Sequence, residues 1–212
     1  MPYQTAGNIF LHFEGHNNVS DYYRELDIAN AVTTTRYKHN GVEFVRRTIA
    51  SFADDVIIMH ISANKKGAIT FDLDYKSRAP HKVGNNAKSF VVYGQGTDHE
   101  SIKGEVRYQI HAFAKNTGGN VRLSENKFSV SGADEVTLYI SIGTNFTNYK
   151  SLTANEGKRA AQKLENAIKT DFKKALKAHS AIYAQQFNRF SLHLGQNADA
   201  AKLPTNERIA NF

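Results

Sequence analysis

The chain has 212 residues, no cysteine, and 27 Lys and Arg against 20 Asp and Glu, for a formal net charge of +7. This length predicts one large domain, or a domain with an appendage, that buries its core without disulfide bonds. The lack of cysteine excludes disulfides, cysteine nucleophiles and cysteine-ligated zinc. The basic residues are spread from Arg24 to Arg208. This spread favours a soluble basic surface over a nucleic-acid site, which would gather them in a stripe with exposed aromatics.

The sequence also lacks the signals for a membrane or for export. No run approaches the roughly 18 apolar residues of a membrane helix. The start, Met1–Asn8, has neither the basic beginning nor the apolar core of a signal peptide. We therefore predict no membrane partner and no nucleic-acid partner, and the compartment stays open.

Short strand-like runs fill the first two-thirds of the chain, separated by polar turns rich in glycine. Residues 67–75 alternate most clearly, with apolar side chains on one face and Thr70, Asp72 and Asp74 on the other. Asn40-Gly41 is the signal of a two-residue hairpin. The predicted strands are 9–13, 34–37, 42–50, 55–62, 67–75, 89–93, 106–113 and 136–142. Strands at this spacing, with no helices between them, predict a mainly β, antiparallel sandwich.

From about Ala154 the pattern becomes helical. Apolar residues recur at spacings of three and four with lysines on the other face, which predicts a helix over 156–178. A second apolar set follows, made of His179, Ile182, Tyr183 and Phe187. Residues 189–194 alternate as a strand does, and the tail 196–212 is polar and linker-like, with a helix start at 205–208. We therefore divide the chain into a β-sandwich domain, 1–153, and a helical linker segment, 154–212.

Two carboxylates are the strongest catalytic candidates in the sequence. Asp72 and Asp74 share one face of a predicted strand and lie about 6 to 7 Å apart at the usual rise per residue. A glycosidase places its two carboxyl groups about 5 to 9.5 Å apart across the bond that it cleaves, so this spacing is compatible with that chemistry. An amphipathic strand also carries carboxylates on its solvated face, and we favour this interpretation.

The remaining motifs indicate local structure. His12 and His16 are four residues apart but flank a strand end, where that spacing does not join two metal ligands, and we interpret them as ordinary polar histidines. Gly94-Gln95-Gly96 lacks the third glycine and the following helix of a phosphate loop, so a turn is expected there. Asp54-Asp55 has the chemistry of a turn.

Two further groups of residues leave alternatives open. Asn18–Ser20 and Asn145–Thr147 match the glycosylation triplet, which is common by chance. Tyr93, Tyr108 and Tyr139 have rings that can stack on sugars, although strand aromatics more often belong to a core. From the residues alone we predict no catalytic, cofactor-binding or metal-binding site.

Four groups of segments together resemble one family. They are Tyr3–Leu11 with Gly15-His16 and 19–22; Tyr23–Ile28 with Ala31, Tyr37, Gly41-Val42 and Arg46–Ser51; Asp55–Ile57 with Ala63–Gly67; and His179, Tyr183, Phe187–Arg189, Leu192, Leu194-Gly195 and Leu203–Arg208. In this order they resemble the N-terminal region of glycoside hydrolase family 95, the α-L-fucosidase-like enzymes. Arg24–Asp27 followed by Arg46–Ser51 is the most specific part.

The resemblance implies a fold and a context. Family members carry an N-terminal β-sandwich, a helical linker, an (α/α)6 barrel that holds the catalytic residues, and a small C-terminal β domain. They invert the configuration while hydrolysing terminal α-L-fucosyl or, in some members, α-L-galactosyl bonds, and they are often exported. No catalytic position of the family maps onto this chain. The implied partners are the barrel of the same parent enzyme and, through it, a carbohydrate substrate.

The resemblance also implies that the sandwich is incomplete. Family members carry further sandwich strands before the Tyr3 segment and continue well beyond the Leu203 segment. We therefore expect an inactive fragment whose exposed sheet edges favour self-association. Two alternatives stay open: a stand-alone carbohydrate-binding module, and a complete small enzyme that uses Asp72 and Asp74.

Overall fold

The computed structural model describes residues 5–124, 127–195 and 199–211. Its strands are β1 (Asn8–His12), β2 (Ser20–Asp27), β3 (Val32–His39), β4 (Val42–Ser51), β5 (Val56–Ala63), β6 (Ile69–Lys76), β7 (His81–Asn85), β8 (Phe90–Gln95), β9 (Arg107–Thr117), β10 (Asn120–Ser124), β11 (Lys127–Ala133) and β12 (Glu135–Thr144). Its helices are α1 (Glu156–Ala167), α2 (Phe172–Phe187), a 3₁₀ turn (Ala200–Lys202) and α3 (Thr205–Ala210). Within this part of the chain, no helix has the length and apolar character needed to cross a membrane.

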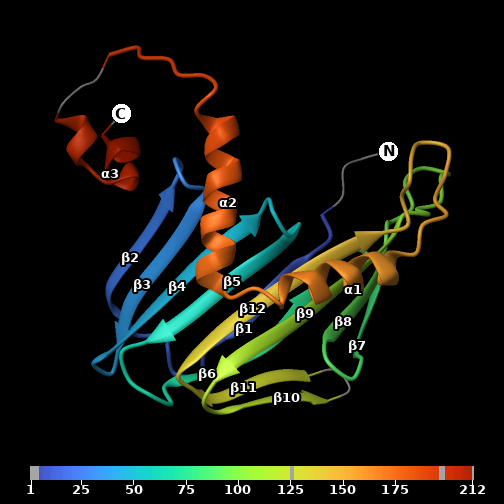
Figure 1. The fold of residues 1–212 in the computed structure, drawn as a ribbon, viewed down its shortest axis with the longest axis horizontal. Helices are drawn as coiled ribbons and strands as arrows, with labels where there is room; N and C mark the ends of the chain where they lie inside the picture. Colours follow the sequence, from blue (N-terminus) through green and yellow to red (C-terminus); the bar gives the residue numbers. More distant parts are fainter. Residues whose placement is uncertain (1–4, 125–126, 196–198, 212) are drawn as a thin grey trace.

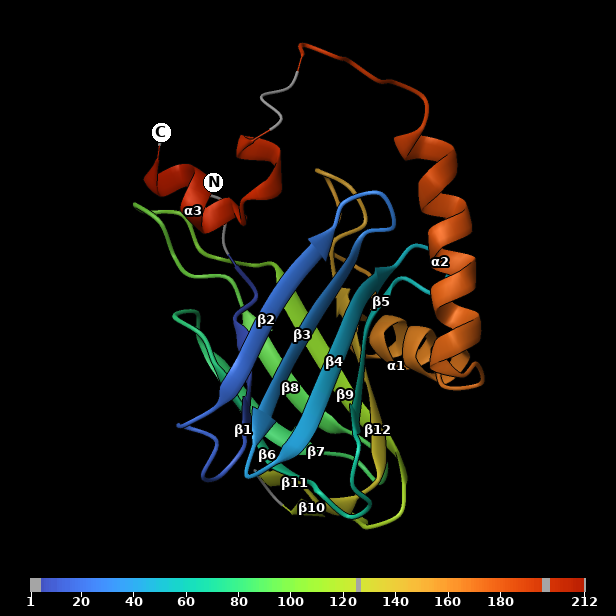
Figure 2. The ribbon, with the colours of Figure 1, turned by 90° about the vertical axis from the view of Figure 1, so that its left-hand side faces the viewer.

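The strands form two antiparallel sheets, which confirms the predicted mainly β fold. The large sheet has eight strands in the order β2-β3-β4-β5-β12-β9-β8-β7, and the small sheet has four in the order β1-β6-β11-β10. Figures 1 and 2 show the small sheet packed against one face of the large sheet and α1 lying across the other. The eight-stranded sheet is therefore the middle layer of the molecule.

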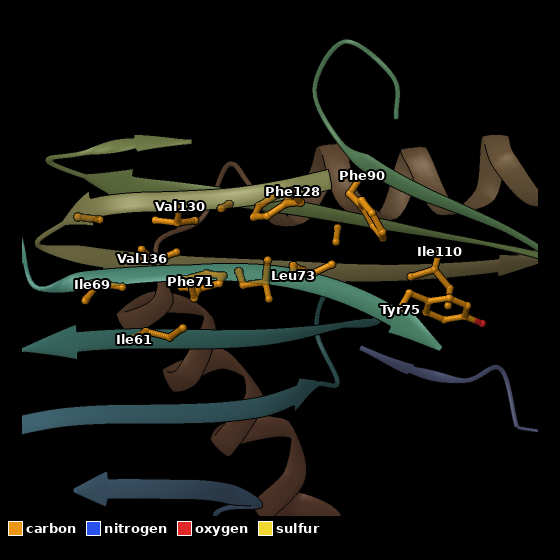
Figure 3. Close-up of a cluster of buried hydrophobic side chains, with 14 of the residues drawn as sticks. Ile61, Ile69, Phe71, Leu73, Tyr75, Phe90, Ile110, Phe128, Val130 and Val136 are labelled. Carbon is orange, nitrogen blue, oxygen red and sulfur yellow. The ribbon is translucent and has the colours of Figure 1, made fainter. Parts of the chain in front are cut away.

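The main core lies between the two sheets. The alternation of β6 places Ile69, Phe71, Leu73 and Tyr75 in this core, all at most 4% exposed. They meet apolar side chains of β11 in the same sheet and of β5, β8, β9 and β12 in the large sheet (Figure 3). The period of two in 67–75 therefore predicts the buried face of β6 correctly.

Turn chemistry sets the first hairpin of the large sheet. Asn40 and Gly41 have φ values of 48° and 76°, and His39 pairs directly with Val42. Both turn residues adopt the left-handed conformation that a two-residue hairpin requires, and Asn and Gly tolerate it best. The predicted hairpin is confirmed.

The helical region differs from its prediction, because two helices replace the single helix over 156–178. Asp171 interrupts the helical path with φ −74° and ψ 160°, and its side chain accepts a hydrogen bond from Lys174 N at 2.8 Å. Asp171 is therefore the N-cap of α2. The apolar spacing continues through the break because both helices pack on the same face of the large sheet.

Other differences concern segments with a weak pattern. Residues 189–194 alternate but form no strand, since none of the strands among the described residues pairs with them. Strands β2, β7, β10 and β11 were not predicted, and β2 is polar or exposed on both of its faces. The helix start at 205–208 is confirmed as α3. Tyr3 and Gln4 of the resemblance, and 196–198 and Phe212 of the predicted linker-like tail, lie outside the described residues.

The small sheet covers the large sheet unevenly. The residues of β5, β12, β9 and β8 that face it are largely buried, whereas Tyr22 and Leu26 of β2 are 60% and 61% exposed. Figure 2 shows β2 as the outermost strand of the large sheet on this side. The expected self-association through such an edge stays a prediction.

Candidate functional site

The two candidate carboxylates lie on the outer face of the small sheet. Asp72 Oδ2 is 3.2 Å from Lys127 Nζ of β11, and Asp74 Oδ2 is 3.9 Å from both Lys76 Nζ and His12 Nε2. Their side chains are 47% and 48% exposed. Each carboxylate already faces a basic group and water. This is the geometry of a solvated strand face rather than of an enclosed sugar pocket.

The two candidate histidines point to different surroundings. His12 ends β1 and is exposed, whereas His16 lies in the following turn, stacks on His39 at 4.2 Å between ring centroids, and places Nδ1 3.0 Å from the Tyr37 hydroxyl. Within the described ranges, no group of three or more His, Asp or Glu gathers that could hold a metal ion. The spacing of four residues does not bring His12 and His16 together.

Gly94-Gln95 is part of a strand, so the predicted turn at 94–96 is wrong for these two residues. They are the last residues of β8, and a Cβ on Gly94 would collide with the ring of Tyr108. Glycine stands at Gly94 because the tyrosine ring occupies the space of a side chain. Of the three candidate tyrosines, Tyr108 and Tyr139 are buried in the two cores, and Tyr93 is 44% exposed.

Asp54 and Asn145 have structural contacts. The Asp54 carboxylate accepts a hydrogen bond from Ser51 Oγ at 2.7 Å in the turn between β4 and β5, which confirms the predicted turn. Asn145 is fully buried, its Oδ1 accepts from Arg107 N at 2.9 Å, and its Nδ2 donates to Glu105 O at 3.1 Å. The Asn145 amide therefore joins the start of β9 to the end of β12.

A second apolar cluster attaches the helices to the large sheet. Its members are Val32, Ile49, Val56, Ile58, Tyr139, Leu164, Ala167, Phe172 and Ala175. Polar side chains of β12 fix the helices further: the Tyr139 hydroxyl donates to Thr170 O and the Ser141 hydroxyl donates to Ala160 O, each at 2.8 Å. We call the side of the large sheet that carries Val32, Ile49, Val56, Ile58 and Tyr139 the helix-docking face.

His179 anchors α2 at one end of the helix-docking face. It is 1% exposed, its Nδ1 accepts from Phe52 N at 3.4 Å, and its Nε2 lies 3.3 Å from Ala31 O. A backbone N–H can only donate and a carbonyl can only accept, so Nε2 carries the proton of a neutral imidazole. One side chain thereby joins α2 to the β2–β3 turn and to the β4–β5 turn.

Aromatic rings continue from this anchor along α2. His179, Tyr183 and Phe187 stack at successive spacings of four, with ring centroids 6.0 and 5.5 Å apart. Figure 1 shows the chain after α2 arching away from the sheet. The last ring of the stack and the apolar side chains beyond it are exposed: Phe187 is 41%, Phe190 78%, Leu192 66% and Leu194 87% exposed. We call these four residues the C-terminal apolar segment, and such a group indicates a contact surface.

The fold defines a class of domain: an antiparallel β-sandwich with a helical linker docked on its larger sheet. Residues 1–149 match the glycosyl hydrolase family 65 N-terminal domain, and the chain belongs to this family of domains. It is thus an N-terminal domain associated with glycoside hydrolases, as the sequence predicted.

Two curated relatives match almost the whole chain. Alpha-L-fucosidase 2 of Arabidopsis thaliana is 26% identical over 99% of this chain, which covers 29% of that protein. Probable alpha-fucosidase A of Aspergillus niger is 23% identical over 99% of this chain, which covers 28% of that protein. The chain therefore spans less than a third of the length of either relative.

A solved structure shares the fold. A putative kojibiose phosphorylase from the human microbiome has a TM-score of 0.57 at 11% identity. The alignment covers 85% of this chain and 28% of the phosphorylase. At this identity the likeness concerns the fold alone.

We predict that His179→Ala lowers the free energy of unfolding by about 2 to 4 kcal/mol, because it leaves a cavity and removes the partners of Phe52 N and Ala31 O. Urea unfolding followed by circular dichroism measures the loss. His193→Ala, at an exposed position beyond α2, is the matched control. A loss for His179→Ala no larger than for the control would contradict the anchoring role.

We also predict that stability falls as the pH drops below the usual histidine pKa of 6.5. Burial lowers the pKa of His60, which stacks on Phe172 at 5.0 Å, and burial lowers the pKa of His111. The unfolded chain binds protons more readily at these two sites, so their contribution to stability is present above pH 6.5 and is lost below it.

Urea unfolding between pH 7.5 and 5.5 tests this dependence. His60→Gln should make the decline with pH shallower, since one buried titrating group is gone, whereas His193→Gln should leave the decline unchanged. An equal decline in the wild type and in His60→Gln would refute the assignment to His60.

Proposed function

We propose that this chain is the non-catalytic N-terminal domain of an α-L-fucosidase-like glycoside hydrolase of family 95 that acts on fucosylated glycans. One observation carries the proposal: two relatives named as fucosidases align along 99% of the chain. That alignment extends beyond residue 149, where the domain match ends, and so includes α1 and α2.

In this proposal, two parts of a longer enzyme have separate roles. This chain supplies the sandwich and the linker, and an (α/α)6 barrel elsewhere in the parent enzyme supplies the catalytic groups. The relatives are more than three times as long as the segment that they share with this chain, which leaves room for such a barrel. The ion pairs of Asp72 and Asp74 also favour a catalytic site elsewhere.

The C-terminal apolar segment is the proposed contact with the barrel. His179, in the middle of α2, holds the helix on the helix-docking face, and the exposed side chains lie at the C-terminal end of α2 and just beyond it. The last turn of α2 carries Phe187, and Phe190, Leu192 and Leu194 follow in the irregular chain just beyond it. Burying them against a second domain removes apolar surface from water, which stabilises the pair of domains.

We predict that the parent enzyme releases L-fucose from a fucosylated oligosaccharide and that the 212-residue chain alone releases none. Asp72→Asn in the parent enzyme should leave the rate unchanged within about twofold. Asp72 lies on a solvated strand face, and its exposed ion pair contributes little to the stability of the domain. Release of the reducing sugar, followed by chromatography, measures both.

If the chain alone releases fucose and Asp72→Asn abolishes the release, the chain is a complete small enzyme. Binding of the oligosaccharide by the chain in the absence of any barrel would favour a stand-alone binding module.

We predict that Phe190→Asp and Leu194→Asp weaken the association between this chain and the separately expressed barrel by at least about tenfold, because each places a charge in an apolar contact. Analytical ultracentrifugation measures the association. Tyr149→Asp is the control, since Tyr149 is 85% exposed and lies in the loop between β12 and α1. Equal affinity for the wild type and for the two segment variants would exclude this contact surface.

A further inference from the structure

A polar hollow lies on the large sheet where the small sheet does not cover it. It has a volume of about 420 Å³ and is lined by residues of β2, β3 and β4 together with His16, Val19 and Met59 of β5. The residues that matter here are His16, Tyr22, Arg24, Thr35, Tyr37 and Arg46. We call it the basic basin.

Strand register builds the basin from residues far apart in the sequence. Arg24 pairs with Thr35, and Thr35 pairs with Arg46, so the three form one row across β2, β3 and β4. Neighbouring strands lie about 4.8 Å apart, which places the two arginine backbones roughly 10 Å from each other. Two side chains of this length, both lining the same hollow, can reach a single small ligand between them.

Arg46 is held in place before any ligand binds. Its guanidinium carbon lies 4.1 Å from the ring centroid of Phe13 and 5.3 Å from that of Tyr37, and its Nη2 donates to the Tyr37 hydroxyl at 2.8 Å. Its Nε is buried and has no hydrogen-bond partner in the part of the chain that the structure describes. A guanidinium that is partly removed from water and lacks an anionic partner is unfavourable, and a bound anion relieves this cost.

The charge of the basin is uncompensated. Among the described residues, neither Arg24 nor Arg46 forms an ion pair with a carboxylate, and no Asp or Glu lines the hollow. The pKa of His16 is lowered, first by burial and then by the positive charges of His39 and Arg46. Two cations that share a hollow with no anion attract a negatively charged ligand.

The rim of the basin suits a sugar ring. The register of β2 shifts between Ser20 and Tyr23, with Asp21 at φ 51°, and Tyr22 within this bulge lines the basin. Bulges re-aim side chains in this way beside binding sites. Tyr22 is 60% exposed, and Thr33, Thr35 and Thr48 also line the basin, where the Thr33 hydroxyl donates to Thr48 O at 3.4 Å. An exposed ring beside several hydroxyls can stack on a sugar and bond to its hydroxyl groups.

We propose that the basic basin binds an acidic sugar unit. Its carboxylate or sulfate group pairs with Arg46 and Arg24, its ring lies against Tyr22, and its hydroxyls bond to the threonines. This role goes beyond the proposed function, because it gives the domain a ligand of its own that does not depend on fucosyl hydrolysis.

Isothermal titration of the 212-residue chain tests the proposal with four probes: a uronic acid disaccharide, a sulfated monosaccharide, neutral L-fucose and sodium sulfate. We expect at least one acidic sugar to bind at least about tenfold more tightly than fucose and than sulfate alone. Comparing the two acidic probes identifies which anion the basin prefers. Equal affinity for fucose, or for free sulfate, would overturn the proposal.

Variants assign the binding to the basin. Arg46→Gln and Arg24→Gln should each weaken the binding of the acidic sugar by at least about tenfold. Arg47→Gln is the matched control, because Arg47 follows Arg46 on β4 but lies on the opposite face of the sheet. If Arg46→Gln unfolds, the exposed Arg24 decides the matter, and unchanged affinity in Arg24→Gln refutes the site. Since the titration involves no hydrolysis, its failure leaves the fucosidase proposal untouched.

Discussion

The large sheet has two apolar faces, and every other layer of the structure depends on covering them. Strand β5 shows the constraint most directly, since Ile58 and Ile61 point to opposite faces and both are fully buried. Leu138 and Tyr139 of β12 repeat this arrangement next to it. A sheet of this kind is stable only as a middle layer. The small sheet covers one face, and α1 with the first turns of α2 covers the other.

This constraint explains why the helices belong to the sandwich although they follow it in the sequence. Apolar residues hold α1 and α2 on the sheet, and the hydroxyls of Tyr139 and Ser141 satisfy carbonyls of the helical segment. His179 then sets where α2 leaves the sheet, because it bonds to two turns at once. The sandwich itself therefore sets the position of α2 on the sheet and the direction in which this helix leaves it.

The chemistry of the large sheet changes where its cover ends. Towards β2 the side chains on the inner face turn from isoleucine, leucine and valine to threonine, tyrosine and arginine. Polar residues are expected on a surface that water reaches. A half-buried arginine without an anionic partner is not, because removing its charge from water is unfavourable. The basic basin therefore differs in kind from Asp72 and Asp74, whose charges are balanced by neighbours in open solvent.

Features that depend on residues close together in the chain can be predicted from the sequence. The alternation of 67–75 predicted the buried face of β6, Asn40-Gly41 predicted its hairpin, and the ordered segments predicted the family of domains. The sequence did not predict the break at Asp171, because an apolar period continues across two helices that share one face. It missed β2, because an exposed edge strand carries no alternation. Only the tertiary structure brought Arg24, Thr35 and Arg46 into one row, since pairing between strands, and not spacing along the chain, decides which distant side chains meet.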